Sequence, residues 1–148
     1  MKIVVLKFGG TSVGTIEKIK NVAKIIGNFK KEKYKVIVVS SAMKGVTNEL
    51  INKSKKISGN FSKAEHDSLV SSGEQVACSL IAGRLIHKGF KSRSWLSWQI
   101  PILTEGPHTN SRISQINKKK IIKYLKEGGT PIITGFQGVN NESRITTI

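Results

Sequence analysis

Apolar residues along this chain follow two patterns, short unbroken runs and longer stretches in which they recur every three or four residues. The runs at 3–6, 36–39 and 131–134 each predict a strand. The run at 36–39 is β-branched and lacks polar alternation, as in a parallel strand covered on both faces, and 131–134 is predicted to be another buried strand. Between the first two runs, apolar residues from 16 to 29 recur at helical spacing. Strand, helix and strand in this order predict a right-handed βαβ unit. The pattern therefore predicts an α/β fold with a parallel sheet.

A second helical stripe extends from about residue 66 to 87, after a surface loop predicted at 57–65. The segment Ser-Ser-Gly-Glu at 71–74 interrupts it. Glycine in a helix interior costs roughly 1 kcal/mol relative to alanine, so we expect Gly73 to permit close packing or ligand approach. Glu74 is a candidate partner for a substrate ammonium, and the alternative is a surface glutamate paired with a lysine.

The region between 90 and 129 is less regular. Residues 90–116 predict a strand, a loop and a short strand around Ile113. A lysine-rich helix should follow Asn117 and end at Gly128 and Gly129, which would form its carboxyl-terminal cap.

Three loops that contain glycine follow predicted strands, at 7–14, 40–48 and 135–138. Because ligands of open α/β sheets bind at the carboxyl ends of the strands, these loops can line one cleft. The first reads Lys-Phe-Gly-Gly-Thr-Ser-Val-Gly, in which backbone amides, a helix start and Lys7 together suit the phosphates of a nucleotide. It matches neither common phosphate-loop pattern, so a simple tight turn is the alternative. In the second loop, Ser41 and Thr47 either face the cleft or serve as helix N-caps.

Composition narrows the range of partners. The 148 residues fit one domain, and 25 Lys and Arg against nine Asp and Glu give a formal charge of +16. This charge favours anionic partners such as nucleotides, nucleic acid or acidic metabolites. No basic strand is interleaved with aromatic residues, so specific nucleic-acid binding is not expected. The lysine clusters are otherwise typical of solvated helix ends.

Cysteine and histidine are sparse. Cys78 lies in an apolar helical stretch and is predicted to be a small core residue, and the three histidines lack the spacing of metal ligands. There is no apolar run of about eighteen residues and no charged-then-apolar leader. From these features we expect a cytoplasmic protein that has no membrane segment and no metal site made of its own side chains.

Several motifs, in this order, resemble those of the aspartate kinases within the amino acid kinase superfamily. Residues 7–13 are similar to the family's Lys-Phe-Gly-Gly-Thr-Ser-Val signature, and 38–48 to its Val-Val-Ser-Ala-Met-x-Gly-Val-Thr-Asn segment. Ser-Gly-Glu at 72–74 and Gly-Phe-Gln-Gly at 135–138 resemble two further family motifs. The resemblance covers essentially the whole chain. It implies a three-layer αβα sandwich with a mostly parallel central sheet.

The resemblance also implies a reaction, transfer of the γ-phosphoryl group of ATP to the side-chain carboxylate of L-aspartate. The product, 4-phospho-L-aspartate, leads to lysine, threonine and methionine, and Mg2+ would be bound through ATP. By position, Lys7 would be catalytic, and the full-length protein is expected to be a homo-oligomer. The residues that would contact ATP phosphates are Lys7, Phe8, Gly9 and Gly10, and those that would hold aspartate are Ser41, Thr47, Glu74 and Phe136.

The chain departs from the family where it ends. Family members continue past the segment that matches 144–147 into Leu-Gly-Arg-Gly-Gly-Ser-Asp, whereas this sequence stops at Ile148. Residues 1–148 are therefore expected to be the amino-terminal part of a kinase domain, without the nucleotide-binding half and the regulatory domains, and inactive alone. The strand at 131–134 would then be an apolar edge that lowers solubility. Smaller departures are Glu105, usually aspartate, and Ser111, usually alanine.

Two other functions are compatible with parts of the sequence. A related kinase with another acceptor, such as acetylglutamate, glutamate or uridylate kinase, would lack the full motifs of the first two loops. A non-catalytic basic module that binds anions would share only the charge.

Overall fold

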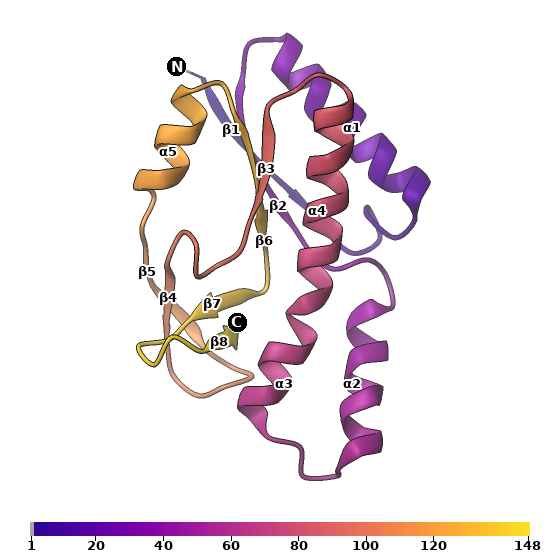
Figure 1. Cartoon of the computed structure of the whole chain (residues 1–148), viewed down its shortest axis with the longest axis vertical. Helices are drawn as coiled ribbons and strands as arrows, with labels where there is room; N and C mark the ends of the chain where they lie inside the picture. Colours follow the sequence, from indigo (N-terminus) through magenta and orange to yellow (C-terminus); the bar gives the residue numbers. More distant parts are fainter. Residues whose placement is uncertain (1) are drawn as a thin grey trace.

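A four-stranded parallel sheet, here called sheet A, organises the molecule (Figure 1). The computed structural model describes residues 2–148. The strands of sheet A, in spatial order, are β1 (Ile3–Phe8), β2 (Lys35–Ser40), β6 (Thr130–Thr134) and β3 (Ser92–Trp95). All three neighbouring pairs are parallel, which confirms the α/β fold with a parallel sheet.

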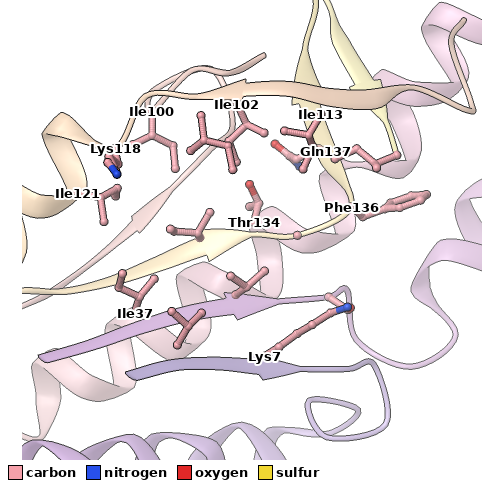
Figure 2. A pocket seen from close by; sticks show the side chains of 17 residues that line it. Lys7, Ile37, Ile100, Ile102, Ile113, Lys118, Ile121, Thr134, Phe136 and Gln137 are labelled. Atoms are coloured by element: carbon pink, nitrogen blue, oxygen red, sulfur yellow. The ribbon is translucent and has the colours of Figure 1, made fainter. Parts of the chain in front are cut away.

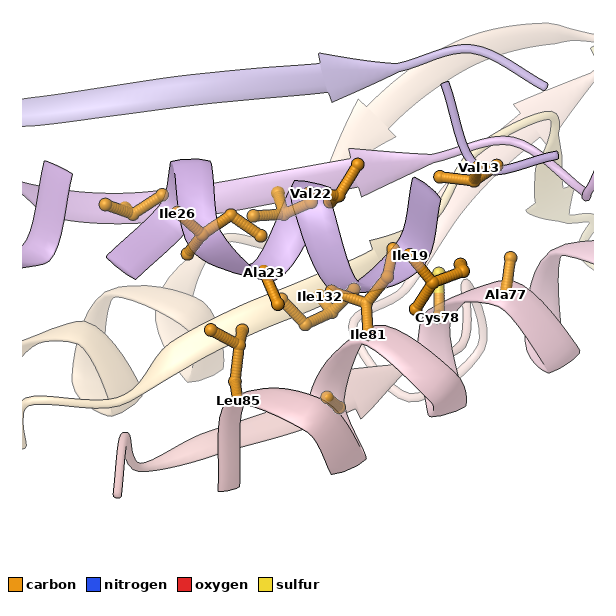
Figure 3. Packing of buried hydrophobic residues seen from close by; sticks show 13 residues of the cluster. Val13, Ile19, Val22, Ala23, Ile26, Ala77, Cys78, Ile81, Leu85 and Ile132 are labelled. Carbon is orange, nitrogen blue, oxygen red and sulfur yellow. The ribbon is translucent and has the colours of Figure 1, made fainter. Parts of the chain in front are cut away.

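Helices cover sheet A from two sides. On one face, α1 (Ile16–Lys31) and α4 (Ser72–His87) pack against Val36, Val38 and Ile132 (Figure 3). On the other face, α5 (Lys119–Lys126) packs against Ile133 and reaches the β2 side chains that alternate with the first set. Gly128 adopts a φ of 82° directly after α5, which confirms the expected glycine cap. Helix, sheet and helix form the three layers that the resemblance implied.

The second face of sheet A is only partly covered. The eight-residue α5 packs against β6, and Val5 in β1 remains 59% exposed. In β2 buried and half-buried residues alternate, so the expectation of a strand covered on both faces at 36–39 is confirmed for one face only. The buried strand predicted at 131–134 is confirmed, because every residue of β6 is buried. The expectation that β6 forms an exposed edge is wrong, because β6 is hydrogen-bonded to β2 on one side and β3 on the other.

The long helical stripe consists of two helices. The first, α3 (Lys63–Val70), is followed by the single residue Ser71, and α4 begins at Ser72. The helix α2 (Val46–Ile57) precedes them, so the predicted surface loop is shorter than expected and covers 58–62. The predicted interruption at 71–74 is therefore confirmed, and it lies at Ser71, the first residue of that segment.

A second sheet, here called sheet B, lies beside the carboxyl ends of sheet A (Figure 1). Its strands in order are β5 (Arg112–Ile116), β4 (Ile102–Glu105), β7 (Gln137–Val139) and β8 (Ile145–Thr147). The sequence predicted β5 around Ile113 and did not reveal β4, β7 or β8. These strands are three to four residues long, and two of their three pairings are antiparallel, so no periodicity marks them.

Candidate active site

Three loops meet at the carboxyl edge of sheet A, and the segment after β2 lies between the other two. The amide of Ser41 donates a hydrogen bond to the carbonyl oxygen of Phe8 at 3.0 Å. The amide of Gly135 donates to the carbonyl oxygen of Ser40 at 2.9 Å. The three glycine-bearing loops therefore lie next to one another, as the sequence predicted.

Glycines let these main chains approach. A Cβ atom on Gly10 would lie 3.1 Å from the carbonyl oxygen of Ala42, and one on Gly135 would lie 3.2 Å from that of Ser40. A Cβ on Gly9 would meet nothing within 4 Å, so this glycine faces open space. The first loop therefore presents an accessible backbone at Gly9 while Gly10 holds the second loop close.

The first loop has the strand, turn and helix geometry that the sequence predicted. The amide of Ser12 donates to the carbonyl oxygen of Gly9 at 2.9 Å and closes a turn. Thr15 caps α1 by accepting a hydrogen bond from the amide of Lys18 at 3.2 Å. Phe8 is half-buried at the end of β1.

Lys7, Ser41 and Phe136 are among the residues that line a groove of about 640 Å³. Figure 2 shows the Lys7 side chain reaching along the sheet toward the strand ends, where Phe136 also lies. Most of the other lining residues are valines and isoleucines of the partly covered face of sheet A, of sheet B and of α5, and the polar residues Lys118, Thr134 and Gln137 also line the groove. The groove can therefore bind an anionic group at Lys7 beside an apolar surface.

Phe136 has an unusual backbone. Its φ is 64°, in the left-handed region that a bulky aromatic residue seldom adopts, and its side chain is 39% exposed. Such a conformation costs on the order of 1–3 kcal/mol and clusters at functional sites. The strain and the exposure together support a ligand-facing role for Phe136.

Glu74 is buried beneath the second loop, with 2% of its surface exposed. Its Oε1 accepts a hydrogen bond from the amide of Ala42 at 3.0 Å, and its Oε2 has no partner. Burial raises the pKa of this carboxyl group to about 7, against the lowering effect of the Ala42 amide. Within residues 2–148 no basic side chain forms an ion pair with it. The alternative of a surface glutamate paired with a lysine is therefore wrong.

Gly73 brings Glu74 to this position. A Cβ atom on Gly73 would lie 2.8 Å from the Cβ of Ala42 and 3.1 Å from Cγ1 of Val46. Only glycine allows the first turn of α4 to approach the second loop so closely. The prediction that Gly73 permits close packing is confirmed.

The N-cap alternative for Ser41 and Thr47 is wrong. The N-cap of α2 is Gly45, with a φ of 86° and no side-chain hydrogen bond. Ser41 lines the groove beside Lys7, whereas Thr47 lies half-buried in the first turn of α2, outside the groove lining. The structure thus brings Lys7, Ser41 and Phe136 into one groove and sets Glu74 behind the second loop.

Two buried polar residues near the site were not predicted. Gln137, 2% exposed, links β7 to the junction of α3 and α4 through a hydrogen bond to the carbonyl oxygen of Ser71. Asp67, fully buried, accepts hydrogen bonds from Thr147, Thr109 and His108. Burial would raise the pKa of Asp67, but these hydrogen bonds lower it below the ordinary value. No periodicity marks either residue, since their partners lie 40 to 80 positions away.

Cys78 is a buried free cysteine one turn after Glu74, as the apolar stretch predicted. Burial and then the nearby Glu74 charge raise its pKa to about 12, so the thiol is unreactive. Across residues 2–148 no three His, Cys, Asp or Glu side chains gather as metal ligands would. In the same range no helix combines the length and apolar character needed to cross a bilayer.

Comparison with known proteins gives the site a family context. Residues 2–147 match the amino acid kinase family. An aspartokinase of Geobacillus stearothermophilus is 47% identical over 148 residues, which make up 100% of this chain and 36% of that protein. The chain therefore spans about a third of the length of that curated relative.

Solved structures agree with this match. The crystal structure of an aspartate kinase from Synechocystis superposes with a TM-score of 0.80 at 35% identity, over 99% of this chain and 24% of that chain. E. coli aspartokinase III, solved in complex with aspartate and ADP, shares the fold with a TM-score of 0.82 at 22% identity, over 99% of this chain and 43% of that chain.

Proposed function

The chain belongs to the amino acid kinase family, and we propose that it forms the amino-terminal part of an aspartate kinase. The reaction is transfer of the γ-phosphoryl group of ATP to the side-chain carboxylate of L-aspartate. An oxygen of that carboxylate forms the new bond to phosphorus, the bond to ADP breaks, and 4-phospho-L-aspartate results. The observation that carries this proposal is the unpartnered, buried Oε2 of Glu74 beside the glycine loops.

On the phosphate side, Lys7 and the turn after β1 would bind ATP. The Lys7 side chain is exposed in the groove, where its ammonium can neutralise charge on the transferring phosphoryl group. Phe8, Gly9 and Gly10 would supply phosphate-facing backbone, for which Gly9 has open space. ATP would bring the phosphoryl group together with Mg2+, which would offset the negative charge of the phosphates.

On the acceptor side, Glu74 would receive the α-ammonium of aspartate. Its Oε1 already accepts a hydrogen bond from the amide of Ala42, whereas Oε2 has no partner. An ammonium there would satisfy an oxygen that is otherwise buried without a partner, and it would favour the ionised carboxylate. Ser41, Thr47 and Phe136 would complete the site, with Phe136 shielding the acceptor from water.

The remainder of the enzyme would lie in the part of the relatives that this chain does not span. We propose that this part provides the contacts to the nucleotide base and ribose and the regulatory domains, and that the whole protein is a cytoplasmic homo-oligomer. Residues 1–148 would then hold both reacting groups without anchoring the nucleotide completely. Because proximity contributes roughly 7–11 kcal/mol to such transfers, we expect no aspartate phosphorylation by this chain alone.

A completed chimera tests the proposal. The 148-residue chain would be joined to the remaining segment of the Geobacillus stearothermophilus aspartokinase and assayed for ADP release with ATP, Mg2+ and L-aspartate. We expect aspartate-dependent turnover by the chimera and none by the chain alone. Equal turnover by both proteins would contradict the proposal that the segment outside this chain is needed to anchor the nucleotide. Turnover by the chimera with acetylglutamate or uridylate, and not with aspartate, would contradict the proposed acceptor.

A further inference from the structure

We infer that Gln137 is a positioning residue that ties the hinge between α3 and α4 to the loop carrying Phe136, and thereby sets Glu74 for the acceptor. The geometric part of this inference stands on contacts within the chain. Its kinetic consequence rests on the proposed function.

The hinge is a single residue. Ser71 is both the last residue flanking α3 and the first flanking α4, and it is 2% exposed. As the residue that precedes α4, Ser71 offers its carbonyl oxygen to the first turn of that helix. The same oxygen accepts a hydrogen bond from Nε2 of Gln137 at 3.0 Å. Gln137 therefore ties the start of α4 to β7.

The other end of the Gln137 amide is also held. Its Oε1 accepts hydrogen bonds from the amide of Ser97 at 3.4 Å and from the Ser97 hydroxyl at 3.2 Å. Ser97 is fully buried and its hydroxyl also lies 3.3 Å from the carbonyl oxygen of Gly138. The Gln137 side chain is therefore immobilised by a donor contact on one side and acceptor contacts on the other. Only an amide of this length combines the two functions.

Both anchored segments lead directly to candidate acceptor residues. Ser71 lies three residues before Glu74, in the turn that opens α4, and Gln137 follows Phe136 in the chain. One side chain thus couples the buried carboxylate to the strained aromatic residue across a sequence separation of 66. Without this contact the first turn of α4 can move relative to the third loop, and water can reach Oε2 of Glu74.

The test compares Gln137→Met with Thr146→Val. Methionine preserves length and neutrality but removes both hydrogen-bonding functions. Thr146 is equally buried in sheet B, and its hydroxyl bonds Thr104 at 2.6 Å without contacting Ser71. Each variant loses one buried polar side chain in the same sheet. Ser97→Ala is a milder variant that removes the hydroxyl donor to Oε1 of Gln137, together with its contact to the Gly138 carbonyl oxygen, and keeps the Ser97 amide donor. It covers the case in which Gln137→Met does not fold.

The first measurement uses the 148-residue chain and needs no enzymatic activity. Side-chain 13C NMR of Glu74 across pH should give a midpoint near 7 in the parent and in Thr146→Val. In Gln137→Met the midpoint should fall by at least one pH unit, and amide exchange at 74–77 should accelerate at least tenfold relative to Ile81. Ser97→Ala should shift both in the same direction by less. Unchanged values in Gln137→Met, or in Ser97→Ala if Gln137→Met is unfolded, would overturn the inference.

The second measurement uses the completed chimera. Gln137→Met should raise the KM for aspartate at least fivefold, with kcat and the KM for ATP within twofold of the parent. Equal loss of kcat in Gln137→Met and Thr146→Val would indicate a merely structural role and would overturn the kinetic claim. If the NMR changes occur while the chimera does not phosphorylate aspartate, the positioning role stands and the proposed function fails.

Discussion

The phosphate side and the acceptor side of the site are built in different ways. The phosphate side forms within the ten consecutive residues 7–16, where the end of a strand, two glycines and a helix start follow one another. The acceptor side is assembled from distant segments, with 32 positions between Ala42 and Glu74 and 66 between Ser71 and Gln137. The first is exposed at Lys7 and Gly9, and the second is buried at Glu74 and Gln137.

Because of this difference, substitutions on the two sides should differ in how they affect the reaction and the stability of the fold. Groups on the phosphate side make few contacts that the fold needs, so their loss should affect the reaction and leave folding unchanged. Groups on the acceptor side are desolvated or held by buried hydrogen bonds, so changes there should alter folding and substrate binding together. Each prediction below tests this separation, beginning with the largest effect.

Lys7→Ala should have the largest effect, and it should be purely catalytic. In the chimera we expect kcat to fall by about 10²–10³-fold, the usual result of removing one group that stabilises transition-state charge. Within residues 2–148 the Lys7 ammonium makes no hydrogen bond or ion pair, so the unfolding free energy of the 148-residue chain should change by less than about 0.5 kcal/mol. Steady-state kinetics and urea unfolding measure the two effects. A large loss of stability would contradict the claim that the phosphate side contributes little to folding.

Glu74→Gln should change stability in a pH-dependent way. The folded-state pKa of Glu74, about 7, lies above the ordinary 4.5, so folding favours the neutral acid. That contribution is complete below pH 4.5 and is lost as the pH rises through 7, where the buried charge must form. Glutamine stays neutral and can still accept the hydrogen bond from Ala42.

Urea unfolding of the 148-residue chain at several pH values measures this effect. Glu74→Gln should be no more stable than the parent at pH 4 and more stable by up to about 3 kcal/mol at pH 8. A difference independent of pH would show that Glu74 is ordinarily solvated and would remove the contrast between the two sides.

Gly10→Ala and Gly9→Ala form a matched pair at the boundary between the sides. The methyl group on Gly10 would press on the carbonyl oxygen of Ala42 at 3.1 Å, while that on Gly9 would meet nothing within 4 Å. We expect Gly10→Ala to lower the unfolding free energy by about 1–2 kcal/mol through overpacking. Gly9→Ala should be neutral or slightly stabilising. Similar thermal unfolding of the two variants would mean that the first and second loops are not held in tight contact.

The same contrast explains what could be predicted from the sequence. In sheet A, β1, β2 and β6 are uninterrupted apolar runs, and the helices α1 and α4 have helical periodicity, so these elements and the three glycine loops could be predicted. Apart from β5, the strands of sheet B could not be predicted, because β4, β7 and β8 are only three to four residues long. β7 pairs with the next strand, β8, and with the distant β4. The exposed edge predicted at β6 failed for a related reason. β3, which follows α4, pairs with β6 across 38 positions, from Ser92 to Thr130, and sequence order alone does not show that insertion.

For the site, the motifs placed Lys7, Ser41 and Phe136 near one another, and the structure puts them in one groove. The burial of Glu74 could not be predicted, because it depends on Gly73 packing against Ala42. Gln137 and Asp67 were missed since a buried polar residue is recognised only through its partners, and those partners are far away in sequence.

The central claim is that Oε2 of Glu74 binds the ammonium group of the acceptor. Succinate is aspartate without its amino group, so the ratio of kcat/KM for aspartate over succinate measures that contact directly. In the parent chimera aspartate should be strongly preferred, and in Glu74→Gln the ratio should fall at least tenfold, chiefly through a higher KM for aspartate. If the ratio is the same in both proteins, Glu74 does not bind the ammonium group and the assignment of the acceptor side is wrong.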